Sequence, residues 1–99
     1  MSHETYVRED VRLILLRALH EQDGETLSDT LLLRTLEAWG HRKSMAFVRN
    51  ELRWLEREAS ALELREMGDH LIAILTQTGA DHVERRIALE GVARPSRRA

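Results

Sequence analysis

Hydrophobic residues recur every three or four positions through the first half of the chain, which is the period of an amphipathic α-helix. The first stripe predicts a helix over residues 6–22; its members are Val7, Val11, Ile14, Leu15, Ala18 and Leu19. A second predicts a helix within residues 26–40, with Ser28 or Asp29 as N-cap and Gly40 as a left-handed C-terminal residue; its members are Leu32, Leu36 and Trp39. The chain is therefore expected to begin with two helices.

A third stripe follows a short turn and carries basic residues on its opposite side. Its apolar members, spaced four, three and four residues apart, are Val48, Leu52, Leu55 and Ala59. At about 100° per residue, these four fall within about 40° of Val48. The opposite face, between about 100° and 220°, holds Lys43, Ala46, Arg49, Asn50, Arg53 and Arg57. We therefore expect a helix with one core face and one basic face that is nearly free of acidic residues.

After residue 60 the hydrophobic period changes to two, which predicts a β-hairpin with its turn at Gly68 and Asp69. Its alternating apolar residues are Leu62, Leu64, Leu71, Ala73 and Leu75. Thr76 is then placed to cap a last helix that ends before Gly91, with Val83 and Ile87 on one side.

These elements predict a single domain over residues 1–91 that is mainly α with a small β-hairpin, an α+β fold. Residues 92–99 contain a proline, a serine and three arginines, and they predict a basic, disordered tail.

Length and composition narrow the classes of protein. The 99 residues, 42% hydrophobic and 32% charged, suit one globular domain with a modest core. No apolar run reaches the roughly 18 residues of a membrane span, and the first ten residues lack the apolar segment of a signal peptide, so a cytoplasmic location is expected. The absence of cysteine excludes disulfides and thiolate catalysis.

Charge is segregated along the chain although the net charge is −2. Residues 41–57 carry five basic and two acidic side chains, and residues 85–99 carry five and one. Two basic segments in acidic surroundings favour a polyanionic partner, whereas the pI of about 6.2 counts against a nucleic-acid-binding domain.

The order of three helices, a hairpin and a last helix resembles the winged helix-turn-helix, with the short turn between the second and third helices. The resemblance is carried by "LLLRTLEAWGH", "VRNELRWLERE" and "LIAILTQTGADHVE". More narrowly, the chain from "EDVRLILLRAL" to "VARPS" is similar to small, ArsR-like winged-helix proteins encoded by Mu-like phages and prophages. In the winged-helix fold the second helix of the motif enters the major groove and the hairpin forms a wing. The resemblance implies this fold, and no biochemical role follows from it.

On this resemblance, the third helix and the turn before it are expected to contact double-stranded DNA through Arg42, Lys43, Ser44, Arg49, Asn50 and Arg53. The basic side chains would neutralise phosphates, and the amide of Asn50 is suited to pair with the edge of an adenine. Ser44, small and near the helix start, would let the backbone approach a groove. His41, in the turn, is a further candidate donor to a phosphate.

The sequence departs from the winged-helix pattern in two places. Many relatives have a glycine after the third helix, where this chain has Ser60 and Ala61, so the wing could be entered with a different bend. The hairpin sets three acidic residues, Glu63, Glu66 and Asp69, against Arg65 alone, which is a poor surface for phosphates. Protein contact is an alternative use of the wing.

Two functions stay open from the sequence. The first is a phage or prophage transcriptional regulator acting as a homodimer, because one winged module buries too little surface for tight specific binding; the first and last helices are the expected interface. The second is a protein-interaction or structural module in phage assembly or host-factor binding, with the basic face merely solvated.

We expect no enzymatic activity. Acid–base catalysis requires titratable groups that converge in a pocket, and carboxylate pairs in a chain with 17 acidic residues are expected by chance alone. We also expect no cofactor and no metal, since the five histidines lack a metal-binding spacing, although His70 and His82 could approach each other across the hairpin.

Overall fold

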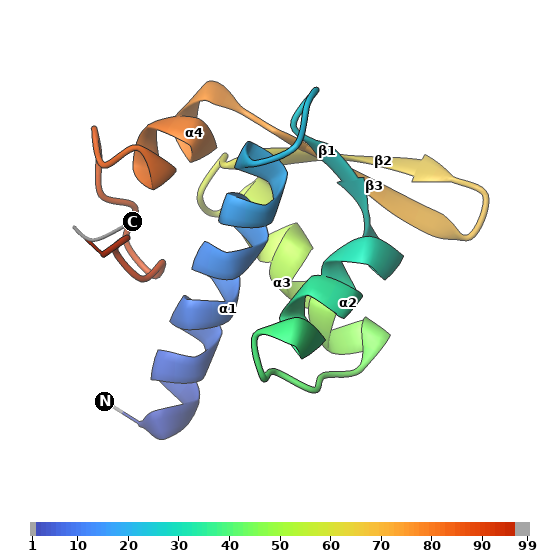
Figure 1. The fold of residues 1–99 in the computed structure, drawn as a ribbon, viewed down its shortest axis with the longest axis horizontal. Helices are drawn as coiled ribbons and strands as arrows, with labels where there is room; N and C mark the ends of the chain where they lie inside the picture. The colour runs from blue at the N-terminus through green and yellow to red at the C-terminus, as the bar shows by residue number, and fades with distance from the viewer. Residues whose placement is uncertain (1, 97–99) are drawn as a thin grey trace.

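The computed structural model describes residues 2–96, in which four helices accompany a three-stranded antiparallel sheet (Figure 1). The elements in chain order are α1 His3–His20, β1 Thr26–Ser28, α2 Asp29–Ala38, α3 Met45–Arg57, β2 Leu62–Met67, β3 His70–Leu75 and α4 Gln77–Val83. In Figure 1, α1 runs through the middle, α2 and α3 lie on one side of it, and α4 and the C-terminal segment lie on the other. The predicted α+β class is confirmed, and the arrangement is compatible with a winged helix-turn-helix.

Helix α1 is the centre of the core. Its N-cap is Ser2, whose hydroxyl accepts a hydrogen bond from the Thr5 N–H, so the helix begins three residues before the predicted start. Six consecutive residues, 11–16, are buried, because neighbouring elements cover the helix on several sides. The predicted stripe is therefore only part of the buried surface of this helix.

The capping residues of α2 act as expected. Ser28 caps α2 through the Leu31 N–H, and Gly40 has a φ of +91°, the left-handed conformation that glycine adopts without strain. The predicted burial of Trp39 is wrong: its side chain is 63% exposed. Helix α2 ends at Ala38, so the core stripe of Leu32 and Leu36 does not extend to the next residue of its period.

The register of α3 is confirmed. Val48, Leu52 and Leu55 are fully buried, as the core face predicted. Ala59 lies beyond the end of the helix at Arg57 and is half-buried. The opposite face is therefore the exposed one.

The hairpin is confirmed, and the sheet contains one strand more than expected. Strands β2 and β3 pair from Leu62–Leu75 to Met67–His70 around the predicted turn. Strand β1 lies directly before α2, where no strand was predicted, and pairs antiparallel with the other edge of β3. The turn into β2 does not need a glycine here, because Ser60 itself adopts a positive φ of 52°.

The last helix is shorter than predicted. Thr76 caps α4 as expected, but the helix ends at Val83, and Arg85 then adopts a left-handed φ of 66°. Ile87 consequently lies outside the helix and is 43% exposed.

The packed chain continues past the boundary predicted at residue 91. Val92 is part of the hydrophobic core, and the Ala93 N–H donates to the Glu9 carbonyl at 3.1 Å. Residues 92 and 93 are therefore packed against the domain, which corrects the predicted disorder there. Residues 97–99 of the predicted tail lie outside the described residues.

Replacing Gly79 by alanine should destabilise the fold although alanine favours helices. A Cβ at Gly79 would lie 2.2 Å from the Ala61 carbonyl oxygen and 2.6 Å from Leu75 Cδ1, so backbone has to move. We expect a loss of about 1 to 3 kcal/mol in thermal or urea unfolding. The exposed change Gln77→Ala in the same helix is the control, expected to stay within about 0.5 kcal/mol of wild type; equal effects would contradict the close approach.

Candidate nucleic-acid interface

The exposed face of α3 carries polar and basic side chains that are available to a partner. Asn50, Arg53 and Arg57 are exposed, and within residues 2–96 no hydrogen bond or ion pair involves their side chains. A shallow hollow of about 260 Å³ lies along this face and is lined by Asn50, Arg53, Trp54, Arg57 and Glu58. The three side chains can therefore bind an anionic surface without breaking an existing contact.

The turn before α3 contributes one exposed cation and several side chains that are already engaged. Arg42 is exposed, whereas the Lys43 Nζ lies 5.1 Å from the centroid of the Phe47 ring. The Ser44 hydroxyl accepts a hydrogen bond from the Phe47 N–H and is the N-cap of α3. His41 Nε2 lies 2.7 Å from Asp10 Oδ2 on α1, so this histidine holds the turn against α1. A role for His41 as a phosphate donor would require this contact to break.

Arg49 differs from the other candidates, because its guanidinium is bound within the protein. Its Nε donates to Asp29 Oδ2 at 2.9 Å, and its Nη2 donates to the Asp69 carbonyl at 2.5 Å. Asp29 is fully buried and also accepts a hydrogen bond from the Leu71 N–H at 3.1 Å, with His70 Nδ1 at 3.4 Å from its other oxygen. These contacts tie together the start of α2, the middle of α3 and the hairpin turn.

The charge state of Asp29 follows from these contacts. Burial is the largest influence and raises the pKa of Asp29. The hydrogen bonds from the Leu71 N–H, Arg49 and His70, together with the positive charge of Arg49, outweigh burial and hold the pKa below its usual value. The carboxylate is therefore ionised at neutral pH, as a counterion to Arg49.

A second buried ion pair supports α3 from its core side. Arg12 on α1 donates to Glu51 Oε1 at 2.6 Å and to the Gly91 carbonyl at 2.8 Å, and both charged side chains are buried. The Arg12 guanidinium also lies 3.7 Å from the centroid of the Trp54 ring. Glu51 therefore points away from the exposed face of α3. The negative charge of this carboxylate is consequently absent from that face. Trp54 is thus engaged by packing against Arg12.

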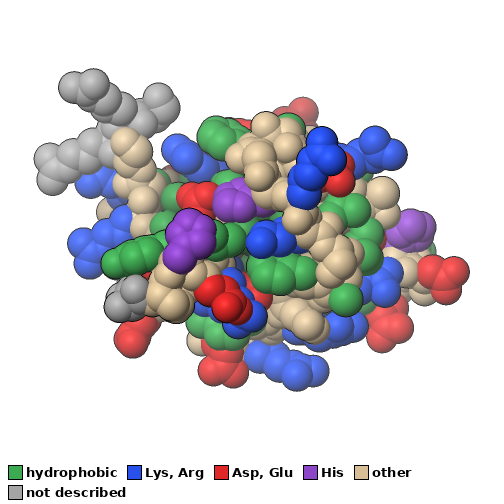
Figure 2. Space-filling view, turned by 90° about the horizontal axis from the view of Figure 1, so that it is seen from below, with side chains coloured by type: hydrophobic (Ala, Val, Ile, Leu, Met, Phe, Trp, Pro, Cys, Tyr) green, Lys and Arg blue, Asp and Glu red, His purple; other side chains and the backbone are tan. Residues whose placement is uncertain are grey.

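The hairpin presents charges of both signs. A hollow of about 470 Å³ separates α3 from the hairpin turn and is lined by Arg49, Arg53, Glu66, Gly68, Asp69, His70 and Leu71. The opposing charges in this hollow give it no strong preference for an anion. Figure 2 shows a similar mixture on the lower face of the molecule, where Lys and Arg side chains are interspersed with Asp, Glu and hydrophobic side chains.

The two histidines of the hairpin and last helix have separate surroundings. His82 is fully buried, with Nε2 donating to the Ala93 carbonyl and Nδ1 accepting from the Leu89 N–H. His70 instead faces Asp29. Within residues 2–96, no group of three or more His, Asp or Glu residues is arranged to hold a metal ion.

Over the same residues, no helix has the length and apolar content needed to cross a membrane.

The chain is similar to two proteins over most of its length. It is 34% identical over 91 residues to gp26, an uncharacterized protein of Escherichia phage Mu, and the match covers 92% of this chain and 93% of gp26. It is 31% identical over 77 residues to an uncharacterized protein of Haemophilus influenzae, and that match covers 78% of this chain and 74% of the other protein. No family model and no solved structure matches the chain.

Proposed function

The chain belongs to the same family as gp26 of phage Mu. We propose that it is a phage or prophage DNA-binding protein that regulates transcription as a homodimer. The observation that carries the proposal is the exposed face of α3, where Asn50, Arg53 and Arg57 lie without partners in the described chain, opposite a fully buried core face. In a winged helix-turn-helix this helix lies in the major groove. A protein with this role acts in the cytoplasm, where phage or prophage DNA is accessible.

The candidate residues divide into two roles under this proposal. Arg42, Lys43 and Arg53 contact phosphates, with Ser44 free to donate its hydroxyl proton while its oxygen caps α3, and Asn50 contacts a base edge. Arg49 holds α3 against Asp29 and the hairpin turn, so its first contribution is to position the helix.

The proposal predicts different effects for Arg53 and Asn50. Arg53→Ala should weaken binding to every DNA sequence and flatten the slope of log affinity against log salt by about 0.9 for each phosphate that the arginine neutralises. Asn50→Ala should weaken the preferred site by roughly 1 to 3 kcal/mol and random DNA by little. Fluorescence anisotropy titrations over a salt series measure both, on duplexes selected from the intergenic DNA of the source phage or prophage.

Arg65→Ala is the matched control, because Arg65 is an exposed arginine on β2 outside the proposed face. It should leave both affinity and salt slope close to wild type. If the wild type and an Arg42→Ala, Arg53→Ala double variant bind equally poorly at low salt, the regulator proposal fails.

A second candidate function is supported by the hairpin. Met67 at its end is 66% exposed, and the hairpin sets Glu63, Glu66 and Asp69 against Arg65 alone, a surface that suits a protein partner better than a phosphate backbone. A winged-helix module for protein interaction in phage assembly or host-factor binding would use this surface. Its partner binding would be impaired by Met67→Glu and unaffected by the loss of Arg53.

A further inference from the structure

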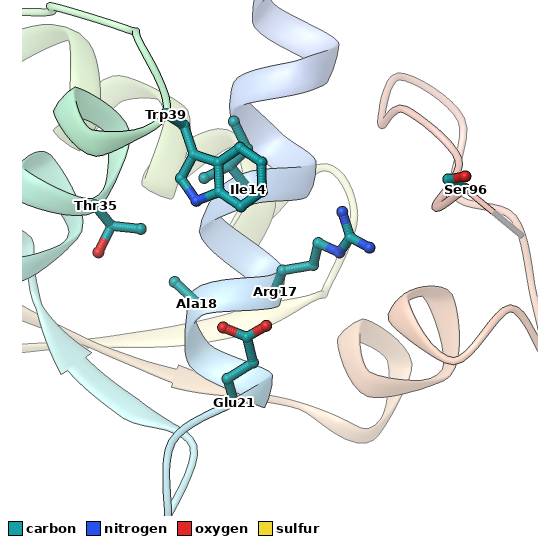
Figure 3. A pocket seen from close by; sticks show the side chains of 7 residues that line it. All are labelled: Ile14, Arg17, Ala18, Glu21, Thr35, Trp39 and Ser96. Carbon is teal, nitrogen blue, oxygen red and sulfur yellow. The ribbon is translucent and has the colours of Figure 1, made fainter. Parts of the chain in front are cut away.

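A groove with an apolar floor lies between α1 and the end of α2, away from the exposed face of α3. It holds about 320 Å³ and is lined by Ile14, Arg17, Ala18, Glu21, Thr35, Trp39 and Ser96. Figure 3 shows the indole of Trp39 beside Ile14, the short side chain of Ala18 next along α1, and Arg17 directed toward Ser96. We call this the α1–α2 groove.

The side of α2 that leads into the groove exposes two large apolar side chains. Leu31, Thr35 and Trp39 follow one another at four-residue spacing, and Leu31 and Trp39 are 51% and 63% exposed. The Thr35 hydroxyl donates to the Leu31 carbonyl at 3.0 Å, so its proton is already used. Exposed tryptophan on a contiguous apolar surface is typical of a protein contact site.

The groove is the side of α1 that the other elements leave open. Helix α4 and the C-terminal segment cover α1 on the other side, where Ala93 is hydrogen-bonded to Glu9. Because α4 has seven residues and Ile87 lies beyond it, the last helix does not present the continuous apolar face that the sequence predicted for dimerisation.

We propose that the α1–α2 groove binds a second copy of this chain about a two-fold axis, with Trp39 of each copy packed into the groove of the other. A two-fold interface must be self-complementary, and the charges at this groove meet that condition. Arg17 and Glu21 both line it, so the axis can bring each Arg17 to the partner's Glu21. Within the described residues, neither side chain forms an ion pair.

The size of the groove also favours this occupant. A hollow of about 320 Å³ is at the lower limit for small-molecule sites and suits one large aromatic side chain. The inference rests on the homodimer of the proposed function and names the surface that forms it.

Sedimentation velocity without DNA tests the inference independently of DNA binding. Wild type should dimerise, and Trp39→Ala should raise the dimer dissociation constant by roughly 30-fold or more, as expected for loss of a central tryptophan. Met67→Ala is the control, because Met67 is similarly exposed at 66% but lies on the hairpin. Thermal melts of each variant at a concentration where all are monomeric verify that the fold is unchanged.

A charge swap gives the second arm. Arg17→Glu and Glu21→Arg should each weaken the dimer, and the double variant should restore it, because the pair is then reversed across the axis. A monomeric wild type at high micromolar concentration would overturn the inference, as would a dimer unaffected by Trp39→Ala. Anisotropy titrations with DNA report separately on the proposed function, so a failed groove and a failed DNA interface give different results.

Discussion

Glu51→Ala is expected to lower the free energy of unfolding by about 3 to 5 kcal/mol, a large part of the roughly 5 to 15 kcal/mol that stabilises a small domain. The change leaves the buried Arg12 guanidinium without its carboxylate, although the Gly91 carbonyl and the Trp54 ring remain beside it. Breaking one side of a buried pair is costly because the other charge stays out of water. Urea unfolding monitored by circular dichroism measures the loss.

The matched control is Glu58→Ala, because Glu58 is an exposed glutamate just beyond the same helix. It should change stability by less than about 0.5 kcal/mol. A double-mutant cycle with Arg12→Ala should show strong coupling, since the two side chains share one hydrogen bond at 2.6 Å. Equal effects of the two glutamate changes would mean that Glu51 is not paired in the folded protein.

The helices and the hairpin could be predicted because their signals are local. A four- and three-residue spacing placed Val48, Leu52 and Leu55 in the core, and they are fully buried. Ser28, Gly40 and Thr76 act as caps because capping depends on residues within one turn of the helix end.

The misses come from interactions between residues that are distant in sequence. Strand β1 has three residues and no distinctive pattern, and its pairing with β3 is what defines it. Trp39 fits the apolar period of α2, but the helix ends before it and its indole borders a groove instead of the core. Val92 lies in a segment whose composition predicts a basic tail, and it is buried because the chain returns to α1.

The sequence predicted which face of the third helix is exposed, but it did not predict the contacts that each residue on that face makes. Helical geometry alone separates Asn50 and Arg53 from the core face, and both are exposed. The same geometry could not reveal that Arg49 is held by Asp29, because the two residues are twenty positions apart and the local pattern around Asp29 indicates only a helix cap. Whether these residues contact DNA stays a prediction.

Asp29→Ala is expected to cost about 3 kcal/mol, the lower end of the range for breaking a buried ion pair, because the Arg49 side chain is 33% exposed and partly regains water. The change also leaves the Leu71 N–H without its acceptor and frees the hairpin turn from α3. Thermal unfolding at pH 7 measures the loss. The control is Asp23→Ala, an exposed aspartate between α1 and β1, which should unfold like wild type.

The pH dependence separates the charge of Asp29 from its shape. The pKa of Asp29 is lowered in the folded protein, so its carboxylate stabilises the fold fully above the unfolded value of about 3.9, and this contribution is lost as the pH falls through the folded pKa. Asp29→Asn keeps the size of the side chain and cannot titrate. The stability difference between wild type and Asp29→Asn should therefore be largest near pH 5 and shrink toward pH 3. A difference that grew as the pH fell would place the folded pKa above the unfolded one, and the Arg49 pairing would then not be what stabilises this carboxylate.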